Sequence, residues 1–367
     1  MTVHIRGGEG GASPERGRTP NIRDVARLAG VSYQTVSRVL NDSPSIRPST
    51  REKVLAVIEE VGYRPNVAAR ALVTSRSRTI GVLSMQSATH YGQTTSLYAV
   101  EAAAREAGYR LSMTTASSAD ASAISSAVDH LTSQAIEALI VIAPQARVFA
   151  AIEQLPVTIP VVTLQPVTGT GRRRVSTDQV AGGRMATRHL IELGHTEIMH
   201  LAGPQDWIEA EARMQGFLQE VTEAELRVRA PILGDWTAHF GYYAGMELLR
   251  YCDFTAVFAA NDQMALGFVH ACRENGLDVP GDISVIGFDD VPEAAHYAPA
   301  LTTVRQDFTE LGRRAVRVLL AELEDVNGDR PASQEATGGS VTPSPEPAVP
   351  VELVVRRSTG RPPVMQS

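Results

Sequence analysis

Residues 30–40, GVSYQTVSRVL, form the most specific stretch of this sequence. Gly30 ends a segment with helical spacing of its apolar residues, and Ser32 is a residue type that caps the start of a helix. The apolar residues after Ser32 fall on one helical face: Val36, Val39 and Leu40. The stretch therefore predicts two short helices that are joined by a turn containing glycine.

The flanking residues extend this pair to three helices. Upstream, apolar residues recur at helical spacing, at Ile22, Val25, Ala26 and Ala29. Downstream, Ser49 and Glu52 have the spacing of a capping box, which predicts that a third helix begins there. Its apolar face would be Val54, Val57, Ile58 and Val61. Three short helices with a glycine turn between the first two are typical of a helix-turn-helix headpiece, here residues 21–65.

Charge is unevenly distributed along the 367 residues. The chain has 34 basic and 41 acidic side chains, a net charge of −7, but residues 1–78 hold 13 basic and 7 acidic ones. That end carries +6 and the remainder −13. A basic end on an acidic body indicates a separate module that binds a polyanion.

The outward face of the second helix suits DNA. Tyr33, Gln34, Ser37 and Arg38 lie opposite the apolar face, near the helix start. A recognition helix presents such residues to base edges in the major groove. Glutamine can bind adenine and arginine can bind guanine through two hydrogen bonds, each worth ~1–3 kcal/mol of discrimination. The alternative is a solvated polar face on a helical hairpin. We expect Arg51, on the third helix, to contact phosphate.

From Ile80 onward, short apolar runs alternate with amphipathic segments. The expected strands are 80–85, 109–113, 138–143, 161–164, 197–203, 256–260, 283–288 and 351–357, and the expected helices are 95–107, 119–133, 179–193, 208–222, 239–250, 263–275 and 308–323. This alternation predicts an α/β core with parallel sheets covered on both faces. We expect two lobes within residues 79–357, with a break near 172–178 and a flexible loop at 326–347. Residues 1–20 read as a disordered arm, 66–78 as a linker and 358–367 as a tail.

Several classes of protein are excluded by missing patterns. No apolar run approaches the ~18 residues of a membrane span, and the N-terminus lacks the apolar region of a signal peptide, so a cytoplasmic location is expected. Cys252 and Cys272 are too few for a disulfide framework. The zinc-protease, hydrolase and phosphate-loop motifs do not occur. We therefore expect no enzyme, no metal and no cofactor.

Several motifs together resemble the LacI/GalR (lactose-repressor) family. They are Gly30–Val39, Thr50–Val54, Ala260–Gly267, Asp282–Asp290 and Leu301–Phe308. The resemblance covers residues 21–325. It implies a transcriptional repressor with a headpiece, a hinge and a two-lobed, periplasmic-binding-protein-like core that dimerises. Its partners would be palindromic double-stranded operator DNA and a small sugar, with no membrane. Leu72 matches the family's hinge leucine, which wedges into the minor groove; without the match it would read as part of a linker.

The resemblance also implies an effector site in the core. Arg213, Asn261, Asp289 and Gln306 match effector-binding positions of sugar-responsive members, and their donors and acceptors suit a polyol. Trp236 matches a tryptophan that faces the sugar ring, and Phe308 an aromatic residue near the lobe crossover.

The sequence departs from the family's namesake at several positions. Gln165 replaces an acidic residue and Glu209 a small hydroxyl residue, while Trp207 is an additional aromatic residue. A second tryptophan leads to the hypothesis of a disaccharide or glycoside effector. No leucine heptad follows Arg357, so a dimer is expected rather than a tetramer built by the tail.

Two other functions compete with a repressor. A solute-binding module would share the two-lobed core, but the basic headpiece and the missing signal peptide argue against it. A sugar-cleaving enzyme would need two suitably spaced carboxylates, and Asp289 with Glu209 is the available pair. No pattern in the sequence supports that spacing.

Overall fold

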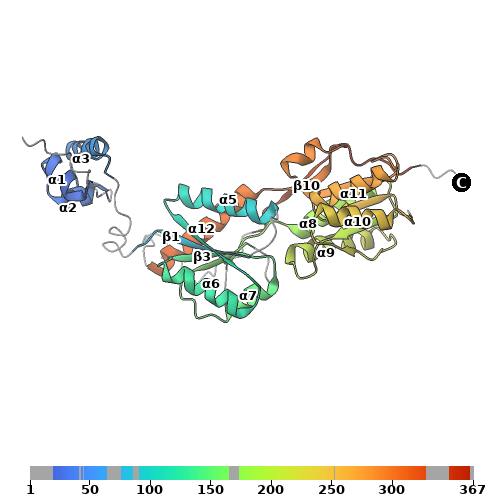
Figure 1. The fold of residues 1–367 in the computed structure, drawn as a ribbon, viewed down its shortest axis with the longest axis horizontal. Helices are drawn as coiled ribbons and strands as arrows, with labels where there is room; N and C mark the ends of the chain where they lie inside the picture. The colour runs from blue at the N-terminus through green and yellow to red at the C-terminus, as the bar shows by residue number, and fades with distance from the viewer. Residues whose placement is uncertain are drawn as a thin grey trace, which may run out of the picture. The chain divides into compact units, whose positions relative to one another are not determined.

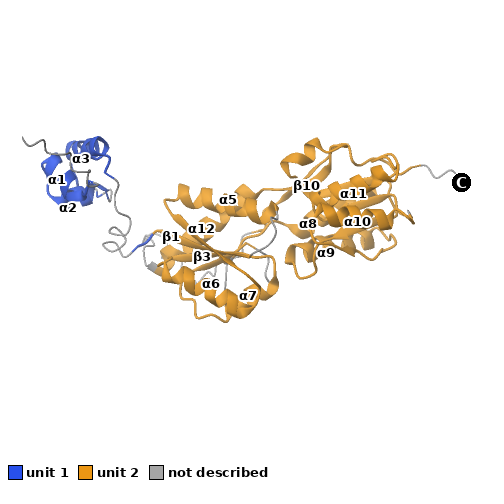
Figure 2. Cartoon of the chain, in the orientation of Figure 1, with its two compact units in different colours: residues 1–77 blue, residues 78–367 orange. Residues whose placement is uncertain are grey.

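The computed structural model describes residues 20–40, 43, 45–63, 76–85, 91–164, 173–251, 253–327 and 347–363. The chain divides into two compact units, residues 1–77 and 78–367 (Figure 2). The expected arm at 1–20, the linker at 66–78 and the loop at 326–347 fall almost entirely outside the described residues. Among the helices that are described, none has the length and apolar character needed to cross a bilayer.

The first unit contains the expected three helices. They are α1 (Ile22–Ala29), α2 (Tyr33–Leu40) and α3 (Pro48–Val61). Their small core is centred on Val25, Ala29, Val36, Val39 and Val54, each at most 3% exposed. Gly30 ends α1 with a φ of 63°, in the left-handed region where glycine carries no Cβ penalty.

The start of α2 agrees with the sequence prediction, and the start of α3 differs from it. The Ser32 Oγ accepts from the backbone N–H of Thr35 at 3.1 Å, as predicted for α2. The capping box predicted at Ser49 is wrong: the N-cap of α3 is Arg47, two residues earlier, and it makes no side-chain capping bond, so the helix begins at Pro48. Proline suits this first position because its φ is preset and it has no N–H to satisfy.

The second unit begins with a five-stranded, all-parallel sheet in the order β2-β1-β3-β4-β5. Its strands are β1 (Thr79–Met85), β2 (Arg110–Ala116), β3 (Ala138–Ile142), β4 (Val161–Thr163) and β5 (Arg173–Arg174). Strands β1 and β3 of this sheet are labelled in Figure 1. Helices α5 (Tyr91–Glu106), α6 (Ala121–Ser133) and α7 (Ala146–Glu153) belong to the same lobe. Every residue of β3 is buried, as expected for a central parallel strand.

The second lobe is built on a six-stranded sheet in the order β11-β10-β9-β8-β6-β7. The strands are β6 (Ile198–Ala202), β7 (Ile232–Leu233), β8 (Ala256–Ala259), β9 (Ser284–Asp289), β10 (Thr302–Gln306) and β11 (Val351–Val354). Its helices are α8 (Gln179–Glu192), α9 (Ile208–Glu223), α10 (Ala238–Leu248), α11 (Asp262–Glu274) and the 3-10 helix η1 (Pro292–His296). The edge strand β11 is antiparallel to β10, and the other pairs are parallel.

Helix α12 (Phe308–Asn327) returns the chain to the first lobe, where it packs beside α5 (Figure 1). Its residues Leu311, Ala315 and Leu319 join the core around Ile80 and Val82. The chain then re-enters the second lobe at β11. The lobes are thus joined at three crossings, residues 175–178, 306–308 and 347–350, of which the sequence indicated the first.

Short or polar elements escaped the sequence pattern. Strands β5 and β7 have two residues each, and α7 has eight. Strand β10 reads TTVRQ, which looks polar, but both threonines are fully buried and hydrogen-bonded. Helix α12 runs to Asn327, beyond the predicted end at 323, because helix-forming residues continue into the segment predicted as a loop.

His200, in the middle of β6, is a buried titratable residue of the second lobe. Its ring stacks on Phe217 and Phe258 at centroid distances of 4.9 and 4.5 Å. Its Nδ1–H donates to the Phe258 carbonyl at 2.9 Å. Complete burial lowers the pKa of His200 to about 4, because the charged imidazolium would lose its hydration.

This pKa predicts a loss of stability in mild acid. Between pH 6.5 and about 4 the unfolded chain binds a proton that folded His200 excludes, so the free energy of unfolding falls by about 2 kcal/mol at pH 5. His200→Phe keeps the stacking and removes this share of the loss. Urea unfolding of the two proteins at pH 7.5 and pH 5 measures this difference in the acid loss. Trp207 and Trp236 lie in the same lobe as His200 and report on its unfolding. An equal acid loss in both proteins contradicts the assignment.

Candidate functional site

The first unit presents an exposed polar face on α2. Tyr33 is 56% exposed, Gln34 and Arg38 are exposed, and Ser37 is half-buried. The opposite side of α2 packs into the small core. Arg51, in the first turn of α3, donates from Nη2 to the Ser43 carbonyl at 3.0 Å, so it also ties the preceding loop to the helix. Leu72 lies outside the described residues.

The second unit contains a polar pocket, which we call the strand-end pocket. It is lined by residues of both lobes: Tyr91, Gly92, Gln93, Trp207, Glu209, Arg213, Trp236, Asn261 and Asp289. About 330 Å³ of its space is unfilled by atoms, part of it open to solvent.

The topology of the sheets explains why these residues meet. Asp289 ends β9, Asn261 follows β8, Trp236 follows β7, and Trp207 follows β6. From the first lobe, Tyr91 begins the helix that follows β1. Parallel strands bring their carboxyl ends to one edge of a sheet, which is where α/β proteins bind ligands.

Arg213 and Asp289 form a buried ion pair in this pocket. Arg213 Nη2 lies 3.3 Å from Asp289 Oδ1, and the two side chains are 4% and 8% exposed. The guanidinium also lies 3.9 Å from the centre of the Phe288 ring and donates to the Ala260 carbonyl. Burial raises the pKa of Asp289, and the nearby Arg213 opposes that rise. The arginine is therefore held rigidly, with its charge balanced inside the protein.

Two glutamines close a ring around this ion pair. Arg213 Nε donates to Gln179 Oε1 at 2.8 Å, and Gln179 Nε2 donates to Gln306 Oε1 at 2.8 Å. Gln306 Nε2 then donates to Asp289 Oδ1 at 2.7 Å. We call these four side chains the polar ring. Arg213 and Asp289 line the pocket, whereas both glutamines lie behind it.

Asn261 holds Trp236 in an uncommon backbone conformation. The Asn261 Oδ1 accepts from the Met264 N–H at 2.9 Å and caps α11, and its Nδ2 donates to the Trp236 carbonyl at 2.9 Å. Trp236 has a φ of 71°, which a bulky residue rarely adopts. Each amide atom of Asn261 retains one further hydrogen-bonding position for a ligand.

Trp207 links the pocket to the other lobe. Its ring lies 5.5 Å from that of Trp236, at an interplanar angle of 59°. Its backbone forms an antiparallel bridge with Gln145 of the first lobe. Nearby, Arg147 Nη2 lies 3.2 Å from Asp206 Oδ2 across the two lobes.

The structure brings most of the expected effector residues together. Arg213, Trp236, Asn261, Asp289 and Trp207 line the pocket, as does Glu209. Gln306 lies one hydrogen bond behind Asp289. Phe308 does not line the pocket: it is buried in the first lobe's core, with its ring 5.9 Å from that of Tyr91. Gln165 lies outside the described residues.

Sequence reasoning missed Tyr91, Gly92, Gln93 and Gln179. The expected helix at 95–107 began four residues too late and so left the first three unassigned. The available signal was that Tyr91–Gln93 follow the first strand of the core, since ligands of α/β proteins bind beyond the carboxyl ends of strands.

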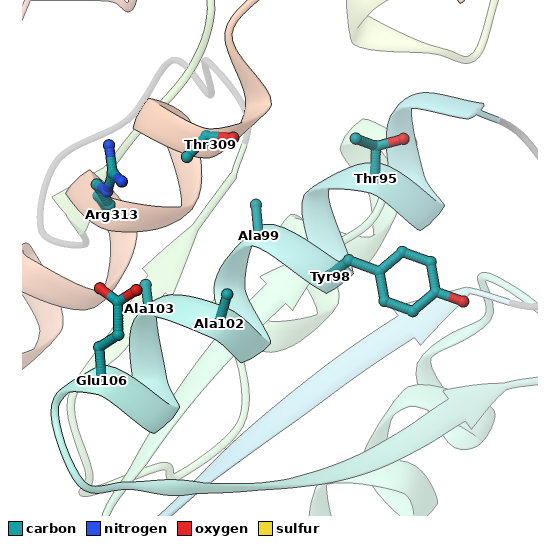
Figure 3. A pocket seen from close by; sticks show the side chains of 8 residues that line it. All are labelled: Thr95, Tyr98, Ala99, Ala102, Ala103, Glu106, Thr309 and Arg313. Carbon is teal, nitrogen blue, oxygen red and sulfur yellow. The ribbon is translucent and has the colours of Figure 1, made fainter. Parts of the chain in front are cut away.

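A second hollow lies between α5 and α12 (Figure 3). Its floor is formed by Ala99, Ala102 and Ala103, with Glu106 and Arg313 at one end. Tyr98 projects outward from α5 and is 68% exposed. None of the expected effector residues lines this hollow.

A helix-turn-helix unit joined to a two-lobed core with a polar pocket between the lobes defines a ligand-responsive DNA-binding regulator. Residues 21–66 match the family model "Bacterial regulatory proteins, lacI family", and residues 187–359 match "Periplasmic binding protein-like domain". The chain is 35% identical to the lactose operon repressor of Escherichia coli (strain K12), over 90% of this chain and 94% of that protein.

Solved structures agree with the sequence comparison. A lac repressor dimer bound to operator and the anti-inducer ONPF has a TM-score of 0.79 at 34% identity, covering 94% of this chain and all of that one. A complex of the regulator CelR with cellobiose has a TM-score of 0.66 at 29% identity, covering 92% of this chain and 99% of that one. The chain belongs to the LacI family of bacterial regulatory proteins and is a DNA-binding transcriptional regulator.

Removing one partner of the buried ion pair should destabilise the core. We expect Arg213→Met to lower the free energy of unfolding by about 3–5 kcal/mol, because the Asp289 carboxylate is left buried without its counter-charge. Adding Asp289→Asn should recover at least about 1 kcal/mol of that loss, which a double-mutant cycle of urea unfolding measures. Strictly additive losses would show that the two charges do not depend on each other.

Proposed function

We propose that this protein is a transcriptional repressor whose affinity for a palindromic DNA operator is changed by a sugar bound in the strand-end pocket. The observation that carries the proposal is the set of polar and aromatic side chains converging on that pocket. A cytoplasmic location, where the operator is accessible, goes with this function.

The hydrogen-bonding groups of the pocket suit a polyol. Asp289 accepts from hydroxyls, Arg213 donates to them, and Asn261 does both. Glu209, half-buried on the pocket wall, adds a further acceptor. The charges of Arg213 and Asp289 balance each other, so neither of these two groups requires a counter-charge on the ligand. A sugar is neutral and carries donors and acceptors on the same hydroxyls.

The two tryptophans support a ligand with apolar ring faces. Trp236 is 6% exposed, and its buried Nε1–H has no hydrogen-bond partner among the described residues. A ligand oxygen would satisfy that donor. Trp207 adds a second aromatic ring in the same pocket, which supports a disaccharide or glycoside. The CelR relative is bound to the disaccharide cellobiose.

The pocket favours binding over catalysis. Asp289, one of the two carboxylates that an acid/base mechanism would use, is held by Arg213 and Gln306. An acid/base pair needs carboxyl groups that are free to exchange protons with the substrate. We therefore infer that the chain acts by binding its effector and its operator, without turnover.

A homodimer would match a two-fold symmetric operator, since two copies of α2 would then read two half-sites. In the second unit, exposed apolar side chains support self-association: Tyr98 on α5 is 68% exposed and Met113 on the edge strand β2 is 52% exposed. Exposed apolar surface of this kind marks interaction sites.

The decisive experiment selects DNA and then tests sugars. The full chain is used to select duplexes from a randomised pool, and binding of the selected duplex is measured with and without cellobiose, lactose, galactose or glucose. We expect two chains per palindromic duplex and a change of at least about fivefold in operator affinity with one of these sugars. Sugar binding without any selected DNA sequence would favour the alternative, a solute-binding module without a regulatory role.

Two arginines of the headpiece should have separable effects on DNA binding. We expect Arg38→Ala to lose ~1–3 kcal/mol of discrimination between the operator and altered duplexes, because a base contact is lost. Arg51→Ala should weaken binding to all duplexes alike and reduce the salt dependence by about one charge. Fluorescence anisotropy at several salt concentrations measures both.

The control for these two variants is Arg250→Ala, which removes the same charge from an exposed site of the second unit. It should leave DNA binding unchanged. Equal losses of specific and non-specific binding in both headpiece variants would overturn the separate roles.

A further inference from the structure

Gln179 lies between the strand-end pocket and the lobe crossings. It is the first residue of α8, directly after the crossing at 175–178, and is 3% exposed. It does not line the pocket. Its side chain nevertheless contacts Arg213, which does line it, through the bond from Arg213 Nε to Gln179 Oε1.

The orientation of the Gln179 amide is determined by its neighbours. Arginine has no acceptor, so the amide oxygen must face Arg213. The NH₂ group then faces the crossings, where it donates to Thr177 Oγ1 at 2.5 Å and to Gln306 Oε1 at 2.8 Å. Gln306 is oriented in the same way, because its NH₂ group donates to the Asp289 carboxylate. Each glutamine therefore has one orientation that satisfies all of its partners.

The side-chain bonds of Gln179 reach the first two crossings, and the first crossing is itself paired with the third. Thr177 belongs to the first crossing and donates to Gln306, where the second crossing begins, at 2.6 Å. The first crossing is paired with the third through the Asp178 N–H and the Val349 carbonyl at 2.9 Å. The Val349 N–H in turn donates to the Ser176 carbonyl at 2.7 Å. One amide thus joins a pocket residue to the segments that connect the lobes.

We propose that Gln179 is a positioning residue that transmits effector occupancy from Arg213 to the lobe crossings. This inference rests on the proposed function. A ligand hydroxyl that bonds to Arg213 or Asp289 competes for atoms used in the polar ring, so the ring must readjust. Because the Gln179 amide has one satisfied orientation, a shift of Arg213 moves its bonds to Thr177 and Gln306 as well.

Two substitutions separate this role from simple support of the pocket. Gln179→Glu keeps an oxygen for Arg213 but cannot donate to Gln306, and it leaves two acceptor oxygens facing each other. Thr177→Val removes the hydroxyl at the first crossing, and with it the bonds to Gln179 and Gln306, but keeps all four side chains of the polar ring. Gln154→Glu makes the same chemical change as the first variant at an exposed helix end and serves as the control.

The experiment measures two quantities on each full-length protein. Calorimetry gives the dissociation constant for whichever of cellobiose, lactose, galactose or glucose most raises the melting temperature of the wild type. Anisotropy with the selected palindromic duplex gives the coupling factor, the ratio of operator dissociation constants with and without saturating sugar. In Gln179→Glu and Thr177→Val we expect the coupling factor to fall from the wild-type value, at least about fivefold, to less than about twofold, and the sugar constant to change by less than about threefold. Gln154→Glu should match the wild type.

Each outcome decides the proposal. Coupling that is unchanged in both variants overturns it, as does loss of sugar affinity in parallel with coupling, which would mean that Gln179 merely supports the pocket. If Gln179→Glu fails to fold, Thr177→Val decides by the same criteria. A wild type that binds its operator but responds to none of the sugars overturns the proposed function, and this inference with it. A wild type that responds, with variants that respond equally, overturns the inference alone.

Discussion

The buried ion pair between Arg213 and Asp289 is the interaction on which the core's chemistry depends. Two charges removed from water are tolerable only when they are close and when their remaining donors and acceptors are satisfied. Here the Ala260 carbonyl, the face of Phe288 and the two glutamines of the polar ring meet that condition. The same requirement keeps these groups rigid at the strand ends, where a ligand can meet them without further ordering.

The topology turns this local constraint into a connection between distant parts of the core. The chain crosses between the lobes three times. At the second crossing, a single residue separates Gln306, which ends β10 in the second lobe, from Phe308, which begins α12 in the first lobe. The polar ring lies against these crossings, and Trp207 bridges to the first lobe on the other side of the pocket. A ligand between the lobes would therefore contact groups bonded to both lobes. Changes of lobe orientation are the kind of two-state element that allostery requires.

Much of the fold follows from the sequence pattern, and the site follows only in part. The helices of the headpiece were predictable because Val36 and Val39 repeat at helical spacing and Gly30 ends α1. Asp289 and Asn261 were expected at the effector site because they match effector-binding positions of the family, and their places at the ends of strands agree with that match. Gln179 was not predictable, since a polar residue at the start of a helix resembles any exposed helix cap. The burial of Gln179 depends on its contacts with Arg213 and Gln306, which lie 34 and 127 residues away in the sequence. Phe308 was assigned to the effector site, but the return of α12 to the first lobe buries it behind Tyr91.

The account's central claim is that pocket and operator are thermodynamically coupled through the core. The most direct test is calorimetric titration of the full chain with the sugar that most raises its melting temperature, with and without saturating operator duplex. Coupling is reciprocal, so the operator should change the sugar dissociation constant by the same factor by which the sugar changes operator affinity. Agreement of the two factors within about twofold is the expected result. A sugar dissociation constant that is the same with and without operator would contradict the account.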